Sequence, residues 1–405
     1  MSDSSVPQYP ITLPQIGLPP AGERCYPFTV RRAKMNSRER MLRVLAGGRV
    51  SPPPVVLHSW GDYKVELAGF HPKFQYYQGG EELAQIERSF YERFKPDWMH
   101  LGSSAWRGFW DRPRKVEDGE AYIRSADGSR WIKIRDDYNL EDYSDVPWWG
   151  RGPTLKLSSK SEIDDYFASI ACTERDIIAS GRFEHMSMLS REFGDSVLIA
   201  LNDGAPGSYL PHHSFEETMI ACVEEPDLVA YCIFKDCERF LTDVRAAKAC
   251  GAHAYIFSEG FAGSLDSISP AMHERLELET KRWFYSQVRE IGLRGIGYFL
   301  GDVRPNMDFI NSLDMAGLMI EEDKKTFVLD PMEIRKMLRP EMCLFGNVDS
   351  LLLKRGGPDR IREEVRRQKA AAEFGAFVIA NGSPLIIGTP PANIDAFMAE
   401  ARLPG

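Results

Sequence analysis

The sequence lacks most of the patterns that assign a site by spacing alone. Its 405 residues include only 7 cysteines and 8 histidines, and no CxxC, HxH, HxC or HExxH pattern occurs among them. Close-spaced ligands of these kinds are the usual signature of a zinc site, so we expect no metal site of the familiar types. The cysteines are scattered and odd in number, which fits reduced thiols rather than a disulfide framework.

The sequence also lacks a basic excess and a long apolar run. The formal net charge is −9, whereas binding to nucleic-acid phosphates needs clustered Lys and Arg. No apolar run approaches the roughly 18 residues that would span a bilayer. The first twenty residues lack the charged-then-apolar order of a signal peptide. We therefore expect a cytoplasmic protein with neither nucleic acid nor a membrane as partner.

The chain begins with an irregular segment and continues as one domain. Residues 1–35 contain several prolines and predict an extended arm that lies on the body or on a partner subunit. Asn36 and Glu39 match a helix N-cap and its capping-box partner, which predicts a helix through Leu45. Residues 36–405 are predicted to form a single domain.

Short apolar runs alternate with amphipathic stretches along this domain. Runs that are buried on both faces and separated by helices indicate parallel βα units, and eight of them favour a closed (β/α)₈ TIM barrel, an α/β fold. A doubly wound open sheet is the alternative. The eight runs are Val55–Leu57, Trp98–Leu101, Val197–Leu201, Ala254–Phe257, Gly295–Leu300, Leu318–Ile320, Cys343–Phe345 and Phe377–Ile379.

The stretch after the second run, residues 103–180, is too long for one βα connection. Within it, Glu120–Arg135 alternates apolar and polar residues around Asp127-Gly128, which predicts a β-hairpin. An aromatic piece with Trp148 and Trp149 follows. An insertion at this position lies on the face where barrel enzymes bind their substrates, so we expect a lid or a pocket wall.

Polar residues follow directly after each predicted strand. In TIM barrels these carboxyl ends converge on the pocket, where acids, amides and hydroxyls suit proton transfer and the orientation of a polar organic substrate. We predict Glu259, Asp302 and His58 as catalytic. The predicted substrate-binding residues are Trp60, Asp62, Tyr63, Ser103, Asn202, His212, Tyr298, Asn347 and Ser383.

Each polar residue at a predicted strand end has a structural alternative, as a helix cap or as a hydrogen-bond partner of the strand end. Asp302, Asp349 and Asp203 could instead cap the helices that follow them. His58 could equally be a core histidine whose ring has hydrogen-bond partners within the protein. Glu259 lies among glycines and aromatic residues, which favours a raised pKa and a role as general acid.

Two further patterns bear on the site. His212 and His213 are neighbours, so at most one of them should face the substrate. A metal site built from Glu259, Asp302 and His58 is geometrically conceivable, but no spacing supports it, and we predict none.

Four segments in order resemble the uroporphyrinogen decarboxylase superfamily from about Asn36 to the C-terminus. They read NSRERMLRVLAGGRVSPPPVV, GAHAYIFSEGFAG, CLFGNVDSLLLKRGGPDRIREEVRR and FVIANGSPLIIGTPPANIDAF. The resemblance implies the (β/α)₈ fold and a homodimer. It also implies one of two activities, porphyrinogen decarboxylation or cobalamin-dependent methyl transfer.

The chain departs from the motifs of both activities. Decarboxylases of the family carry an RQAGR-type motif after the first strand, whereas residues 58–63 here read HSWGDY, without an arginine to hold carboxylates. The family's late histidine falls near Ser383, and its strand-end Asp-Ser pair falls near Glu259-Gly260. The family's methyltransferases hold zinc with an HxC pair and a distant Cys, but here these positions are Tyr298-Phe299-Leu300 and Ser383.

Three functions follow as hypotheses. The first is a corrinoid-linked methyltransferase or demethylase with a metal-free, acid-assisted site and a small polar organic substrate. Here a corrinoid such as methylcobalamin is a co-substrate, free or carried by a corrinoid protein, and no cofactor is tightly bound. The second is a decarboxylase, a carboxy-lyase acting on a smaller carboxylated substrate. The third is a non-enzymatic member that binds a small molecule or a corrinoid protein.

Overall fold

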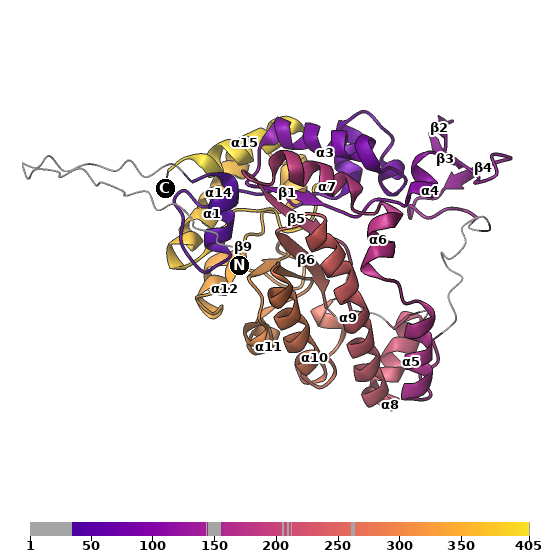
Figure 1. The fold of residues 1–405 in the computed structure, drawn as a ribbon. Helices are drawn as coiled ribbons and strands as arrows, with labels where there is room; N and C mark the ends of the chain where they lie inside the picture. The colour runs from indigo at the N-terminus through magenta and orange to yellow at the C-terminus, as the bar shows by residue number, and fades with distance from the viewer. Residues whose placement is uncertain are drawn as a thin grey trace, which may run out of the picture. The chain divides into compact units, whose positions relative to one another are not determined.

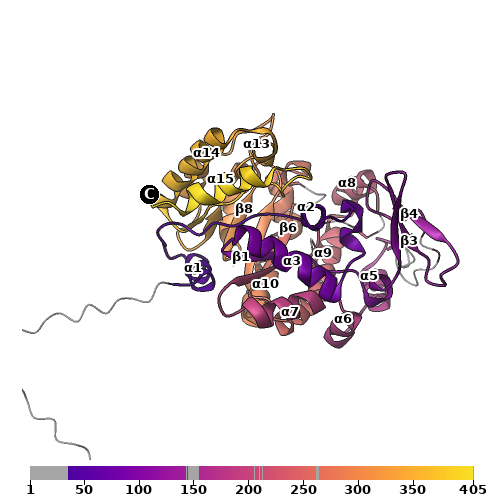
Figure 2. The same cartoon turned by 90° about the horizontal axis from the view of Figure 1, so that it is seen from above.

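The computed structural model describes residues 35–142, 144, 155–204, 206–208, 210–211, 213–260 and 264–404. The predicted N-terminal arm lies outside the described residues except for Met35, and so does the piece with Trp148 and Trp149. The rest forms a body of helices packed around a central parallel sheet, shown from two directions in Figures 1 and 2.

Seven strands form the central sheet, and all its pairs are parallel. The sheet is curved, and every strand coincides with one of the predicted apolar runs to within two residues. In spatial order the strands are β1 (Trp98–Leu101), β5 (Leu198–Asn202), β6 (Ala254–Glu259), β7 (Arg294–Phe299), β8 (Gly317–Ile320), β9 (Cys343–Phe345) and β10 (Phe377–Val378).

The first predicted run, Val55–Leu57, is not one of these seven strands. Val55 instead forms an isolated parallel bridge with Ile379, just beyond β10. On its other side, the backbone N–H of Asp97 donates to the carbonyl of Val55 at 2.8 Å, directly before β1. This segment therefore makes hydrogen bonds beside both edge strands of the sheet.

Side chains alternate between the two faces of the sheet. Ala254 and Ile256 of β6 belong to an inner cluster that also contains Trp98, Phe345 and residues of helix α1 (Ser37–Val44). Tyr255 and Phe257 belong to the outer cluster, which packs the strands against the surrounding helices. This parity decides which strand-end side chains face the interior of the sheet and which face helices.

The helices cover the outer face of the sheet, with α3, α7, α9 and α10 visible around it in Figure 1. The capping box predicted at Asn36 and Glu39 is present at the start of α1. The remaining helices are α2 (Gly61–Leu67), η1 (Pro72–Tyr76), α3 (Gly80–Phe94), α4 (Arg107–Trp110), α5 (Lys160–Ser169), α6 (Glu174–Ser180), α7 (Glu184–Phe193), α8 (Phe215–Glu224), α9 (Pro226–Ala249), η3 (Leu265–Ser267), α10 (Pro270–Ile291), η4 (Arg304–Asn306), α11 (Met307–Ser312), α12 (Pro331–Met337), α13 (Ser350–Arg355), α14 (Pro358–Ala371), η5 (Ala372–Phe374) and α15 (Pro391–Arg402).

A second, antiparallel sheet follows β1 and α4. It contains β2 (Arg114–Glu117), β3 (Glu120–Arg124) and β4 (Trp131–Ile134), so that β2 joins the two strands expected from the sequence. Gly128 has φ +71°, which the turn between β3 and β4 requires. Ala121, Ile123, Ile132 and Ile134 bury one face of this sheet against η1 and α3 residues such as Phe74 and Ile86.

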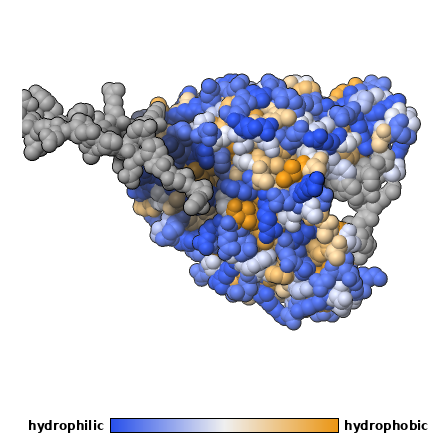
Figure 3. All heavy atoms as spheres, viewed as in Figure 1, coloured by the Kyte–Doolittle hydropathy of each residue, from blue (hydrophilic) through white to orange (hydrophobic). Residues whose placement is uncertain are grey.

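The surface of the body is mainly polar, with smaller apolar areas between the polar ones on the face drawn in Figure 3. Among the described residues, no helix is long and apolar enough to cross a membrane.

Candidate functional site

A cavity of about 230 Å³ opens where β1 and β5 end. We call it the inner chamber. Of the residues predicted from the sequence to bind substrate, Trp60, Ser103 and Asn202 line it. Its other lining residues are Ser59, Gly61, Gln75, Tyr76, Leu83, Glu87, His100, Gly102, Asp203 and Gly204.

A second cavity of about 490 Å³, the outer chamber, shares Tyr76, Ser103 and Asp203 with the first. Its walls come from η1, from the start of α4 and from the loop after β4. The remaining lining residues are Tyr77, Ser104, Ala105, Trp106, Phe109, Asp137, Tyr138, Asn139 and Arg182. The stretch predicted as an insertion thus supplies much of a pocket wall.

An ion-paired arginine lies at the junction of the chambers. Arg182 donates from Nη2 to Asp203 at 2.6 Å and from Nη1 to Asp243 at 2.8 Å. Ser103 donates to the second oxygen of Asp203 at 2.7 Å. Asp203 therefore does not cap a helix, which was one alternative for it, and both its oxygens have protein partners.

His58 is fully buried in the interior of the sheet. Its Nδ1 lies 3.1 Å from the carbonyl oxygen of Gly382, which can only accept, so Nδ1 carries the proton. Burial lowers the pKa of His58 to about 4, which makes the ring neutral at pH 7. Nε2 then holds a lone pair, and it has no hydrogen-bond partner among the described residues. His58 is thus a buried acceptor with a fixed tautomer.

His100 connects His58 to the inner chamber. Its ring lies 5.1 Å from that of His58, centroid to centroid, and stacks on Trp98. Its Nδ1 lies 2.8 Å from the carbonyl of Ser59, while Nε2 has no partner among the described residues. Burial lowers the pKa of His100 well below its usual value, with further lowering by His58 and Lys64. Two neutral imidazoles therefore adjoin at the end of β1.

Tyr298 and Ser383 meet beside His58, although 85 positions separate them in the sequence. The ring of Tyr298 lies 4.8 Å from that of His58, and the hydroxyl of Ser383 lies near enough to the phenol to oppose, in part, the rise in its pKa. Ser383 in turn donates to Glu322 Oε1 at 2.8 Å. Because burial raises the pKa of Tyr298, its phenol stays protonated. We call the three residues the Tyr298–Ser383–Glu322 chain.

Glu322 ends this chain. Lys324 lies 2.7 Å from its Oε1 in an ion pair, while Oε2 is buried without a partner among the described residues. His58, Tyr298 and Ser383 were predicted from the sequence, and the structure brings them together. His100 and Glu322 were not predicted as site residues.

Other predicted substrate-binding residues lie outside the chambers. Tyr63 is buried against α3 and donates its hydroxyl to the carbonyl of Thr389 at 3.0 Å. Asp62 accepts from the N–H of Tyr63 at 2.8 Å, and burial raises its pKa. Asn347 is buried and donates to the carbonyls of Glu321 and Leu329 at 3.2 and 2.9 Å. His212 lies outside the described residues.

Asp302 and Asp349 have local partners. Arg304 binds both oxygens of Asp302, at 2.9 and 2.8 Å, and holds its pKa below the usual value. Asp349 caps α13 by accepting from the N–H of Leu351 at 2.7 Å. The capping alternative therefore applies to Asp349. Asp302 forms a bidentate pair with Arg304 and also accepts from its backbone N–H at 3.0 Å, at the start of η4.

Glu259 faces α10 instead of the interior of the sheet. Its side chain is on the same side of β6 as those of Tyr255 and Phe257, the side that faces the helices. There Lys281 donates to one carboxylate oxygen and Tyr285 to the other, both at 2.6 Å. Burial raises the pKa of Glu259 against the opposing effect of Lys281. Glu259 thus contacts two buried side chains of α10, whereas His58 contacts His100 and Tyr298 on the inner side of the sheet, so the structure separates the two predicted catalytic residues.

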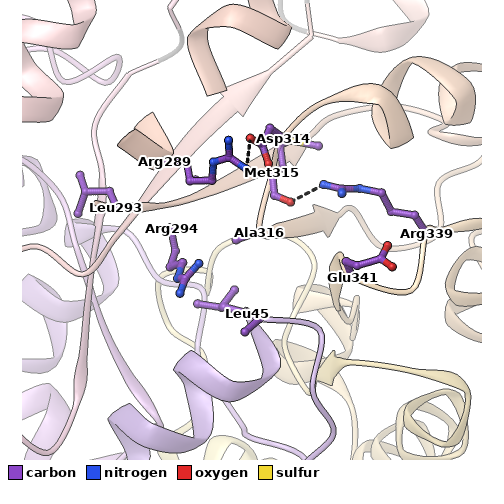
Figure 4. A pocket seen from close by; sticks show the side chains of 11 residues that line it. Leu45, Arg289, Leu293, Arg294, Asp314, Met315, Ala316, Arg339 and Glu341 are labelled. Atoms are coloured by element: carbon purple, nitrogen blue, oxygen red, sulfur yellow. Dashed lines mark hydrogen bonds and ion pairs between the residues drawn. The ribbon is translucent and has the colours of Figure 1, made fainter. Parts of the chain in front are cut away.

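No group of three or more His, Cys, Asp or Glu side chains among the described residues is arranged to hold a metal ion. Another cavity, of about 160 Å³, lies at the opposite end of the strands, where Leu45 of α1 approaches the start of β7. Figure 4 shows Arg289 paired with Asp314 there, and Arg339 donating to the carbonyl of Met315. These contacts tie loops at the amino ends of the strands.

The sequence offered a signal for one of the two residues it missed in the cluster. His100 follows Trp98 by two positions in an apolar strand, so both side chains face inward. The wall formed by Tyr76, Tyr138 and Arg182 had no such signal, because these residues come from loops whose positions depend on tertiary packing.

The buried ion pair between Lys281 and Glu259 predicts a large effect on the free energy of unfolding. We expect Lys281→Met to lower the free energy of unfolding by about 3–5 kcal/mol, because it leaves Glu259 as an uncompensated buried carboxylate. The double variant Glu259→Gln, Lys281→Met should recover much of this loss. Urea denaturation of the three proteins measures both effects. Equal destabilisation by the single and the double change would contradict the pairing.

The buried histidines predict a pH dependence. The pKa values of His58 and His185 are lowered to about 4 by burial, whereas unfolded histidine titrates near 6.5. Between these pH values the unfolded state binds more protons, so stability falls as the pH falls from about 6.5 to about 4, on the order of 3 kcal/mol for each residue. Urea denaturation across this range measures the slope. His185→Gln should flatten it, and an unchanged slope would be the contrary result.

Comparisons with known proteins bear on the family. The uroporphyrinogen decarboxylase (URO-D) family profile matches residues 180–403. A methyltransferase from Methanosarcina mazei shares the fold, with a TM-score of 0.62 and 17% identity over 91% of this chain and 98% of that one.

A xylose isomerase-like TIM barrel protein from Mycobacterium smegmatis matches with a TM-score of 0.33 and 13% identity over 61% of this chain and 90% of that one, too low to carry an argument. A search of curated proteins finds no significant match. Since the family profile covers more than half of the sequence, this chain belongs to the uroporphyrinogen decarboxylase family.

Proposed function

We propose that this chain transfers a methyl group between a small polar organic substrate and a corrinoid co-substrate, at a site whose proton donor is the Tyr298–Ser383–Glu322 chain. The observation that carries the proposal is the position of these residues. By the resemblance, Tyr298 and Ser383 stand where the family's methyltransferases hold zinc with a His and a distant Cys, and here the two side chains lie close to each other beside His58.

The residues at this place do not fit zinc. Zinc sites take thiolate, imidazole or carboxylate ligands. Tyr298, Leu300 and Ser383 offer a phenol, an alkyl group and a hydroxyl, and burial keeps the phenol protonated. We therefore derive no step through a metal.

Methyl transfer at a site without zinc needs a proton donor in place of a Lewis acid. In demethylation, the bond between the methyl carbon and the substrate's oxygen or nitrogen breaks, and the leaving atom keeps the electron pair and gains a proton. The methyl group would pass to a reduced corrinoid, which would supply the electron pair of the new bond. A protonated phenol can give that proton, and Ser383 lies between the phenol and the Glu322 carboxylate, to which it donates a hydrogen bond. Methylation runs through the same groups in reverse.

The histidines contribute acceptors. His100 lines the inner chamber with a buried Nε2 that has no described protein partner, so it can accept a hydrogen bond from the substrate. His58 packs between His100 and Tyr298 and holds both rings in edge contact. Geometry supports these roles for the histidines, because aromatic contacts and a fixed tautomer hold the imidazoles in place before a substrate binds.

Methyl transfer has more support than decarboxylation. One solved structure that shares the fold, from Methanosarcina mazei, is named a methyltransferase. A carboxylated substrate needs free guanidinium groups, and Arg182 at the chamber junction already binds Asp203 and Asp243 with both terminal nitrogens.

Several finer features belong to the same proposal. We take Val55–Leu57 as the eighth strand of a closed (β/α)₈ barrel, because it hydrogen-bonds beside both β10 and β1. The arm, residues 1–35, and the insertion, residues 103–180, are then additions to that barrel. We propose a homodimer, with a corrinoid free or carried by a corrinoid protein.

Removal of one hydroxyl tests the function. We expect Tyr298→Phe to lower the rate of methyl transfer from methylated substrates to a reduced corrinoid by about 10²–10⁴-fold, because the proton donor is lost while the ring contacts remain. Methylcobalamin formation, followed by absorbance with a panel of O- and N-methylated compounds, measures the rate.

Tyr231→Phe is the matched control, since the Tyr231 hydroxyl binds Asp164 on the outer helices. It should leave the rate unchanged. An active wild-type protein whose Tyr298→Phe variant keeps full activity would contradict the role of the phenol. Release of carbon dioxide from a carboxylated substrate, with no methyl transfer, would contradict the proposed reaction.

A further inference from the structure

We propose that the outer chamber binds a planar aromatic compound of one or two rings, with a polar substituent of that compound pointing toward Ser103 and the inner chamber. The binding site stands on the geometry of the chamber alone. The identification of this compound as the substrate class rests on the proposed function, under which the methyl group would be carried by the polar substituent.

Five aromatic side chains of the described residues line the chamber. They come from three separate stretches, namely the region of η1, the start of α4 and the loop after β4, and they are Tyr76, Tyr77, Trp106, Phe109 and Tyr138. A cavity walled by rings from three directions offers both faces and edges to a flat ligand. Aromatic rings pair best in offset-stacked or edge-to-face arrangements.

The rings of the wall hold one another in place. Tyr76 and Tyr138 meet edge to face with centroids 5.7 Å apart, as do Tyr77 and Phe109 at the same distance. The hydroxyl of Tyr77 also donates to the carbonyl of Tyr138 at 2.7 Å and ties the loop after β4 to η1. The wall is therefore organised before a ligand enters, which lowers the entropic cost of binding.

The charges in the chamber favour a neutral ring over a cation. Aromatic cages for quaternary ammonium groups attract the cation through the ring faces. Here the chamber includes Arg182, but that guanidinium is itself paired with Asp203 and Asp243. The lining carboxylates are already paired, Asp203 with Arg182 and Asp137 with Arg135. Among the lining residues that the structure describes, no acid is left to neutralise an ammonium group.

The sizes of the two chambers fit such a ligand. Pockets for small molecules typically have volumes of roughly 300–1,000 Å³, and the outer chamber has about 490 Å³. The inner chamber is smaller, about 230 Å³, and carries polar groups from Ser103, Asn202 and His100. A ring in the outer chamber would therefore direct its polar substituent toward the buried imidazoles.

A direct binding measurement tests whether the outer chamber binds aromatic compounds, and it needs no corrinoid. Isothermal titration calorimetry of the full chain with 2-naphthol and with phenol should show binding, whereas their saturated analogues decahydro-2-naphthol and cyclohexanol should bind more weakly. Trp106→Leu and Tyr76→Leu should each weaken 2-naphthol binding about threefold to tenfold, since each removes one ring contact. Tyr76 is half exposed, so its variant guards against a loss caused by misfolding.

Trp131→Leu is the control, because Trp131 lies on β4 against Lys115 and Arg124, outside the chamber. It should bind 2-naphthol like the wild type. Absence of binding, equal binding of the saturated analogues, unchanged binding in both chamber variants, or displacement of 2-naphthol by tetramethylammonium would each overturn the proposal. A failed methyl-transfer assay would leave these binding results standing, so the two proposals fail separately.

Discussion

The contact between His58 and the Asn381-Gly382 turn determines most of what the site can do. Asn381 accepts from the N–H of His58 at 2.9 Å and donates to its carbonyl at 2.8 Å, across 323 positions of sequence. The same turn presents the Gly382 carbonyl that fixes the tautomer of the His58 ring. Because unpaired buried backbone groups are costly, this clamp holds the segment before α2 against the end of the sheet. The position of the imidazole and its lone pair both depend on it.

From this clamp the polar groups extend in two directions. On one side His58 contacts Tyr298, which leads through Ser383 to Glu322. On the other it contacts His100, which reaches the inner chamber. The resemblance to the family's methyltransferases implies that Tyr298, Leu300 and Ser383 stand at the three zinc-ligand positions. Of these, Tyr298 contacts His58, and Ser383 donates to Glu322.

The sequence predicted the framework better than the site. Apolar runs located the strands, because strands buried on both faces leave a strong local signal, and Asn36 and Glu39 marked the first helix. For Glu259, the neighbouring residues in the sequence did not indicate which side of β6 its side chain faces. Its glycine and aromatic neighbours suggested a pocket, but it shares the outward parity of Tyr255 and Phe257, which points it at Lys281. The chamber walls could not be predicted, since Arg182 is placed by Asp203 and Asp243, both distant in sequence.

The central claim is that His58 is a neutral, buried acceptor in contact with His100 of the inner chamber. Nitrogen-15 NMR of the histidine side chains, with His58 assigned by comparison with a His58→Gln variant, tests this most directly. The account predicts a ring protonated on Nδ1 only, from pH 7 down to about pH 5, and an Nε2 signal that moves when an aromatic ligand binds. A His58 ring that is charged at pH 7, or protonated on Nε2 alone, would contradict it.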